Sequence, residues 1–268
     1  MDESLAAPRL LAGAPNFRDI GGLRGAGGRA VRQRLVYRSG ALDQLLDEDL
    51  ARLAGFGLGL CCDLRTAAER LHSPSRWPPG GTPRLLELEF ASDVRALSPE
   101  LMQALREAPS ADLALQLMLD LYRGMPAACA PLLARLLPDL ANAPDALPVV
   151  IHCTAGKDRT GFVVAVLLGV LGVADADVYA DYLRSNHAAS ELRRNPKVQL
   201  LLEQLLGMKP DPHAVRALTG ALPDYLDAAL EAVRRGWGSV EDYLAEASGV
   251  DAAMQERLRR HLLEPAAP

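Results

Sequence analysis

Lysine, aromatic residues and cysteine are all scarce in this chain of 268 residues. Only three of its 29 basic residues are lysines, and Phe, Trp and Tyr together make up 4% of it. The four cysteines are Cys61, Cys62, Cys129 and Cys153. Their spacing fits neither a metal site nor a disulfide framework, which indicates free thiols in a reducing compartment. We therefore expect no bound metal and no domain stabilised by disulfides.

Long apolar runs and an excess of basic charge are absent as well. The longest apolar run follows Gly161, is broken by Gly169 and Gly172, and is too short to span a membrane. The formal net charge is −5, so the surface as a whole does not attract nucleic acid. The first residues carry acids and lack a basic segment followed by an apolar one, so we expect no signal peptide and a cytoplasmic location, with secretion by a route that needs no signal peptide as the alternative. Because no nucleotide-binding motif occurs, we expect no cofactor.

The order of the predicted elements indicates the fold class. Strand patterns alternate with helical patterns, which is typical of an α/β fold with a mostly parallel central sheet flanked by helices. Strands are expected over 34–39, 58–65, 84–90 and 149–152. Helices are expected over 46–57, 98–140 and 160–172, and in "GSVEDYL", where Ser239 and Asp242 have capping-box spacing.

The pattern also suggests how the domain is organised. We predict a single domain over residues 1–268, with a helical C-terminal part, 175–264, that packs onto the sheet. The segment 96–125 has two interpretations: a helical lid over the functional site, or helices that pack in the core.

The stretch "VVIHCTAGKDRTGFVVAVLLG", residues 149–169, places a cysteine between a strand and a helix. Ligands of parallel sheets bind beyond the carboxyl ends of the strands, and Cys153 follows such an end. Gly156 permits a tight curve, so the backbone N–H groups of residues 154–159 and the N-terminus of the next helix favour an anion. With Arg159, this loop would stabilise a thiolate beside a cradle for a tetrahedral dianion, which suits phosphoryl transfer to sulfur.

A second cysteine is also followed six positions later by an arginine, in "CAPLLAR" from Cys129 to Arg135. That copy has no glycine and no preceding strand, and it lies in a helical leucine pattern. We interpret Cys129 as a buried helical cysteine, so the context around Cys153 carries the signal rather than the bare spacing.

The motif "HCTAGKDRTG" resembles the phosphate-binding loop of the cysteine-dependent tyrosine and dual-specificity phosphatases. More narrowly, it resembles the atypical bacterial tyrosine and lipid phosphatases whose loop reads HCxxGKDRTG. The stretches "NFRDIGG", "YRSG", "DLRTAAE" and "GSVEDYL" are similar to that group too, so the resemblance covers about residues 14–262. It implies a phosphatase that acts on phosphotyrosine, with phosphoserine, phosphothreonine and phosphoinositides as further substrate classes.

The resemblance implies a role for each loop residue. Cys153 is the expected nucleophile that forms a phosphocysteine, and Arg159 is expected to bind the phosphate. Thr160 is expected to donate a hydrogen bond to the thiolate or to serve as a helix cap, and His152 to brace the loop or to be an ordinary core histidine. The remaining phosphate- or substrate-binding positions are Thr154, Ala155, Gly156 and Lys157.

The general acid that protonates the leaving oxygen is open between three carboxylates. The chain has "WPPG" at 77–80 and lacks the Trp-Pro-Asp loop of ordinary tyrosine phosphatases. Asp158, inside the loop, ranks first because the Asp-Arg-Thr ending resembles myotubularin-type lipid phosphatases. Asp93, after a predicted strand, ranks second by its resemblance to dual-specificity phosphatases. Asp63 ranks third, since it has an alternative as a structural partner for Arg65 or Arg38.

Lys157 has two interpretations. At the rim of the loop it would bind the additional phosphates of phosphoinositides; alternatively it is a solvated surface lysine.

Four other residues near the motifs have alternatives. Arg18 with Asp19 is expected to form a structural ion pair, with a place in the lining of the pocket as the alternative. Cys61 and Cys62 are expected to be buried and inert, with a protective disulfide to Cys153 as the alternative.

Two alternatives to a phosphatase follow from the same residues. One is a catalytically inactive phosphate-recognition module, which the intact Cys153, Arg159 and Thr160 argue against. The other is a sulfur-transferring, rhodanese-like enzyme, whose loop is normally shorter and lacks the Gly-Lys-Asp-Arg-Thr-Gly pattern. The expected partners are a phosphorylated protein or a phosphoinositide, and phosphate or other oxyanions in the loop.

Overall fold

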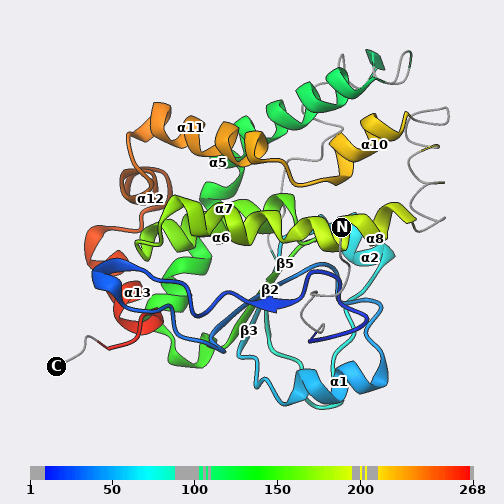
Figure 1. Cartoon of the computed structure of the whole chain (residues 1–268). Helices are drawn as coiled ribbons and strands as arrows, with labels where there is room; N and C mark the ends of the chain where they lie inside the picture. The colour runs from blue at the N-terminus through cyan, green and yellow to red at the C-terminus, as the bar shows by residue number, and fades with distance from the viewer. Residues whose placement is uncertain are drawn as a thin grey trace.

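A five-stranded sheet forms the centre of the part of the chain that the computed structural model describes, which is residues 10–87, 103–104, 107, 110–194, 200, 203 and 211–265. The strands are β1 (Arg18–Asp19), β2 (Val36–Ser39), β3 (Leu60–Asp63), β4 (Arg84–Glu87) and β5 (Val149–His152). Their order in the sheet is β1-β2-β5-β3-β4. Only β1 is antiparallel to its neighbour among these strands, so the mostly parallel sheet confirms the predicted fold class (Figure 1).

Helices flank this sheet on both faces (Figure 1). Those of the first half are α1 (Asp47–Ala54), α2 (Ala67–His72) and α5 (Ala111–Asn142). Those after β5 are α6 (Asp158–Val170), α7 (Asp175–Leu183), α8 (Ser185–Arg194), α10 (Pro212–Thr219), α11 (Pro223–Trp237), α12 (Val240–Ser248) and α13 (Ala252–Leu262). No helix in the described ranges combines the length and the apolarity that crossing a membrane requires.

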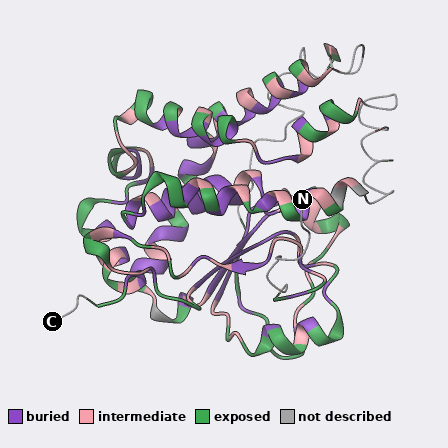
Figure 2. Cartoon of the chain, viewed as in Figure 1, coloured by how far each residue is buried: buried purple, intermediate pink, exposed green. Residues whose placement is uncertain are grey.

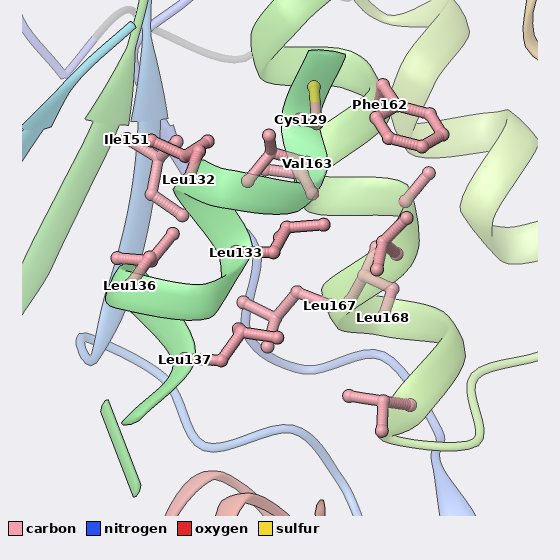
Figure 3. Packing of buried hydrophobic residues seen from close by; sticks show 14 of the residues in the cluster. Cys129, Leu132, Leu133, Leu136, Leu137, Ile151, Phe162, Val163, Leu167 and Leu168 are labelled. Carbon is pink, nitrogen blue, oxygen red and sulfur yellow. The ribbon is translucent and has the colours of Figure 1, made fainter. Parts of the chain in front are cut away.

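The central strands β2, β3 and β5 are buried on both faces, which explains the continuous apolar runs of β3 and β5 (Figure 2), whereas only Leu86 is buried in the edge strand β4. Because successive side chains of a strand alternate, Cys61 and Val150 pack with Leu53 of α1, while Cys62 and Ile151 face the other side. There α5 and α6 cover the sheet, and Figure 3 shows Ile151 beside their interlocking apolar side chains.

The longest helix, α5, begins at Ala111 and is capped by Ser110, whose Oγ accepts a hydrogen bond from the Leu113 N–H at 3.2 Å. Within residues 111–125, which belong to the segment with two interpretations, Ala114 and Leu117 pack with Ala214 and Ala217 of α10 in a separate small cluster, while Met118, Leu121 and Tyr122 belong to the main apolar core. Most of 96–109 lies outside the described residues. Side chains of α11, α12 and α13 share one apolar cluster with the sheet. The prediction of a single domain over 1–268 stays a prediction.

Local signals account for several helix boundaries. Ser239 caps α12 as predicted, accepting a hydrogen bond from the Asp242 N–H at 3.0 Å. The helix after β5 begins at Asp158 rather than Thr160. The helix α2 was not predicted, although Thr66 and Glu69 form a capping box, each side chain bonding to the other residue's N–H.

Candidate active site

The loop after β5 lies at the carboxyl edge of the sheet, where parallel strands place ligands. Cys153 follows β5 and is 2% exposed. Gly156 has a φ of 66°, and a Cβ there would lie 2.4 Å from the carbonyl carbon and oxygen of Ser39. The close approach to β2 and the left-handed conformation both require glycine at this position. Since α6 begins at Asp158, the loop ends on the positive pole of that helix.

Two donors from distant parts of the chain fix the curve of the loop at Gly156. Its carbonyl oxygen accepts hydrogen bonds from Asn16 Nδ2 at 2.7 Å and from Arg38 Nη2 at 2.9 Å. In a trans peptide the next N–H, that of Lys157, points away from the carbonyl. The motifs "NFRDIGG" and "YRSG" therefore supply the side chains that orient the loop peptide.

A buried ion-pair network holds those donors in place. Asp181 of α7 accepts from Arg18 Nε at 2.8 Å and from Arg38 Nη1 at 2.5 Å. Burial would raise the pKa of Asp181, but the charges and hydrogen bonds of Arg38 and Arg18 outweigh it and lower the pKa to about 2. The predicted pair between Arg18 and Asp19 is wrong, because Asp19 instead accepts from the backbone N–H groups of Gly21 and Arg34.

Arg159 is held by Glu69, a residue that the sequence analysis missed. The two side chains form a bidentate pair, with both N···O distances 2.8 Å, and Arg159 also donates to the Leu64 carbonyl at 2.8 Å. Glu69 accepts a further hydrogen bond from Thr154 Oγ1 at 2.6 Å. Burial would raise the pKa of Glu69, but Arg159 and Thr154 outweigh it and lower the pKa to about 2. The capping-box spacing of Thr66 and Glu69 was the signal available in the sequence.

Both interpretations of Lys157 are wrong, since it is neither at the rim of the loop nor solvated. It is 3% exposed, and its Nζ donates to the carbonyls of Leu218 at 3.0 Å and Gly220 at 2.9 Å. The same Nζ lies 3.2 Å from Asp158 Oδ1. Because a buried ammonium group needs acceptors, the carbonyls at the end of α10 explain its position, and Lys157 ties the loop to that helix.

The three candidate acids lie in different surroundings. Asp63 forms a buried, multiply hydrogen-bonded pair with Arg65, with Nη2···Oδ2 at 2.7 Å, which is the structural alternative predicted for it. Burial would raise the pKa of Asp63, but the Arg65 hydrogen bonds outweigh it and lower the pKa. Asp93 lies outside the described residues. Asp158 is in the loop itself, with 24% of its side chain exposed, and its Oδ1 accepts from Tyr122 Oη at 2.7 Å.

His152 and Thr160 are both completely buried beside the loop. Burial lowers the pKa of His152 to about 4, so its ring is neutral at pH 7. Its Nδ1 lies 3.4 Å from the Cys153 carbonyl oxygen, and its Nε2 lies 3.5 Å from Asp63 Oδ2. Thr160 Oγ1 has no hydrogen-bond partner among the described residues, although buried hydroxyls usually have one.

All four cysteines of the chain are free thiols, and all four are buried. Burial raises the pKa of the Cys61, Cys62 and Cys129 thiols, so they stay protonated and unreactive at neutral pH. Cys129 is a fully buried residue of α5, as predicted. The described residues contain no group of three or more His, Cys, Asp or Glu side chains placed to hold a metal ion.

A cysteine and an arginine on one tightly curved loop, between a parallel strand and a helix N-terminus, define an oxyanion site of the kind that phosphatases use. A family model described as the tyrosine phosphatase family matches residues 10–264. The chain therefore belongs to the tyrosine phosphatase family and is a hydrolase.

Relatives support this membership over nearly the whole chain. A protein of Cupriavidus necator that is named as a tyrosine-protein phosphatase is 37% identical over 253 residues, covering 92% of this chain and 85% of the relative. The triple specificity protein phosphatase PtpB of Mycobacterium tuberculosis is 31% identical over 289 residues, covering 96% and 99% respectively. A tyrosine-protein phosphatase of Nostoc commune is 30% identical over 164 residues, covering 59% and 50%.

Proposed function

We propose that the protein hydrolyses phosphotyrosine through a phosphocysteine intermediate on Cys153. The observation that carries the proposal is the loop: Cys153 stands at the carboxyl end of β5, Gly156 curves the backbone, and α6 begins at Asp158. Such a loop stabilises both a thiolate and the phosphate dianion that it attacks.

The proposed reaction has two steps. In the first, Sγ of Cys153 attacks phosphorus, the bond from phosphorus to the tyrosyl oxygen breaks, and Asp158 transfers its proton to that oxygen. In the second, water attacks phosphorus, the S–P bond breaks, and Asp158 takes a proton from the water as inorganic phosphate leaves. Arg159 holds the equatorial oxygens of the phosphoryl group in both steps. Thr160, whose hydroxyl has no partner among the described residues, donates to the departing thiolate.

The family and one relative support the proposed substrate class. Lys157 gives no support for phosphoinositides, because its ammonium group is buried on the carbonyls of Leu218 and Gly220. A triple specificity phosphatase among the relatives supports a broader specificity than phosphotyrosine alone. We therefore propose phosphotyrosine as the main substrate, with phosphoserine, phosphothreonine and phosphoinositides as secondary classes.

The proposal is tested by phosphate release in EDTA from a phosphotyrosine peptide, a phosphoserine peptide and a phosphoinositide. We expect turnover that is fastest on phosphotyrosine, is inhibited by vanadate and is lost on treatment with iodoacetamide. Vanadate should slow that alkylation, because it occupies the loop that contains Cys153. Alkylation that vanadate slows, with no turnover on any substrate, would favour the phosphate-recognition module instead.

Replacing Glu69 with glutamine is expected to lower kcat on phosphotyrosine about 10-fold, because the amide no longer matches the guanidinium fork of Arg159. The matched control is Glu87→Gln, since Glu87 is a half-exposed partner of Arg70 at 3.6 Å, the one ion pair found for it among the described residues. Steady-state kinetics and vanadate affinity check the prediction. Equal kcat values for the two variants would show that Arg159 is positioned without Glu69.

A further inference from the structure

Half of the six tyrosines of this aromatic-poor chain gather behind the active-site loop. Tyr122 comes from α5, Tyr182 from α7 and Tyr225 from α11, and each is at most 1% exposed. The ring centroid of Tyr122 lies 6.3 Å from that of Tyr182 and 5.4 Å from that of Tyr225. Three separate helices thus place phenol rings at the start of α6.

Two of the hydroxyl groups form a chain of hydrogen bonds that ends on Asp158. Tyr122 Oη donates to Asp158 Oδ1 at 2.7 Å and lies 2.8 Å from Tyr182 Oη. A phenol has one proton, so Tyr182 donates to Tyr122. Burial raises the pKa of both Tyr122 and Tyr182, which keeps these protons in place.

The two carboxylate oxygens of Asp158 differ in their contacts. Among the described residues, Tyr122 Oη and Lys157 Nζ are the groups that contact its carboxylate, and both lie on Oδ1, at 2.7 and 3.2 Å. The side chain keeps 24% exposure, so it is not sealed in the core. A carboxylate held through Oδ1 has Oδ2 available to carry the proton that the reaction needs.

We propose that Tyr122 is a positioning residue that holds the carboxylate of Asp158 through Oδ1 and so directs Oδ2 at the leaving oxygen. The inference rests on the proposed function, in which Asp158 protonates that oxygen. Tyr182 supports the arrangement, because its donated hydrogen bond leaves Tyr122 only Asp158 to donate to. Without the phenol, Lys157 Nζ, at 3.2 Å, is the one group among the described residues that still holds Oδ1.

The leaving group provides the readout, since a proton donor matters for a poor leaving group and little for a good one. The test compares kcat/KM on phenyl phosphate with kcat/KM on p-nitrophenyl phosphate, which reports the first step alone, for Tyr122→Phe, Asp158→Asn and the double variant. The matched control is Tyr243→Phe, which also removes a buried hydroxyl, one that donates to the Pro126 carbonyl at 2.7 Å and not to Asp158.

We expect the kcat/KM of Asp158→Asn to fall about 100-fold on phenyl phosphate and that of Tyr122→Phe about 10-fold, with losses several-fold smaller on p-nitrophenyl phosphate. The double variant should be no slower than Asp158→Asn, because both act through one carboxylate. Tyr243→Phe should affect both substrates alike. Tyr182→Phe, expected to show a smaller selective loss, provides the same comparison if Tyr122→Phe does not fold.

The outcomes separate this inference from the proposed function. A selective loss in Asp158→Asn but an equal loss on both substrates in Tyr122→Phe would overturn the positioning role and leave the proposed function intact. The absence of a selective loss in Asp158→Asn would remove Asp158 as the acid, and the role of Tyr122 with it. Wild-type turnover that iodoacetamide does not affect would contradict the cysteine mechanism itself.

Discussion

Replacing Cys153 with serine is expected to reduce phosphate release from a phosphotyrosine peptide by a factor on the order of 10⁴ or more. The serine hydroxyl is not ionised at neutral pH, so the loop would hold the phosphate without a nucleophile beneath it. Binding of phosphate and vanadate should persist, because the backbone N–H groups and Arg159 are unchanged. Phosphate release and isothermal titration with inorganic phosphate measure the two effects separately.

The chain offers a matched control for that experiment. Cys129 is also buried and is also followed six positions later by an arginine, but it lies within α5. Cys129→Ala should keep the wild-type turnover per folded molecule and lose only some stability. Retention of activity in Cys153→Ser, or its loss in Cys129→Ala at full folding, would contradict the assignment of the nucleophile.

The second large effect is expected on stability. Asp181→Asn should lower the free energy of unfolding by about 3–5 kcal/mol, because it leaves the buried Arg18 and Arg38 without their carboxylate. Both arginines also hold the region of Gly156, through Arg38 Nη2 and through the contacts of Arg18 with Asn16, so the loop should lose order as well. Urea denaturation followed by circular dichroism measures the change.

The control for this variant lies on the same helix. Asp175 begins α7, is 75% exposed and is 3.5 Å from Arg234, so Asp175→Asn should change the free energy of unfolding by less than about 1 kcal/mol. If both variants were destabilised equally, the network around Asp181 would contribute no more than a surface pair.

The pH dependence of stability gives an independent check on Asp181. Its pKa is lowered from 3.8 to about 2 in the folded chain, so its contribution is complete above about pH 5 and is lost as the pH falls toward 2. The variant Asp181→Asn lacks this pH-dependent contribution to the free energy of unfolding. The difference in unfolding free energy between the wild type and the variant should therefore shrink as the pH falls through this range. A difference that does not change with pH would contradict the lowered pKa.

Many elements of the fold could be predicted because their signals are local. The apolar run "VVIH" and the following Cys153 indicate a buried strand that ends at a loop, and β5 occupies that place in the structure. The spacing of Ser239 and Asp242 predicted a helix cap, and Ser239 caps α12. The helix 111–142 continues through Pro126, Pro131 and Pro138, although proline tends to break a helix. The packing of this helix against α10, α11 and the sheet outweighs that tendency.

Side chains that act across long sequence separations could not be placed from the sequence. Lys157 follows Gly156 directly, yet its position is decided by carbonyls 61 and 63 residues later. Arg18 is next to Asp19 in the chain but pairs with Asp181, 163 residues away. A buried charge pairs with whatever acceptor the packed helices bring to it, and neighbours along a strand point to opposite faces.

The sequence by itself determined the α/β class, the loop from Cys153 to Thr160 and the kind of chemistry that a thiol, a curved backbone and an arginine support. The apolar pattern of a strand, a glycine that permits a tight curve and the start of a helix each depend on adjacent residues, so the sequence alone is enough to predict them. Only the tertiary structure decided that Glu69 holds Arg159, that Lys157 is an anchor to α10, and that Tyr122 donates to Asp158. Those contacts join elements that meet only when α2, α5 and α10 close around the end of β5.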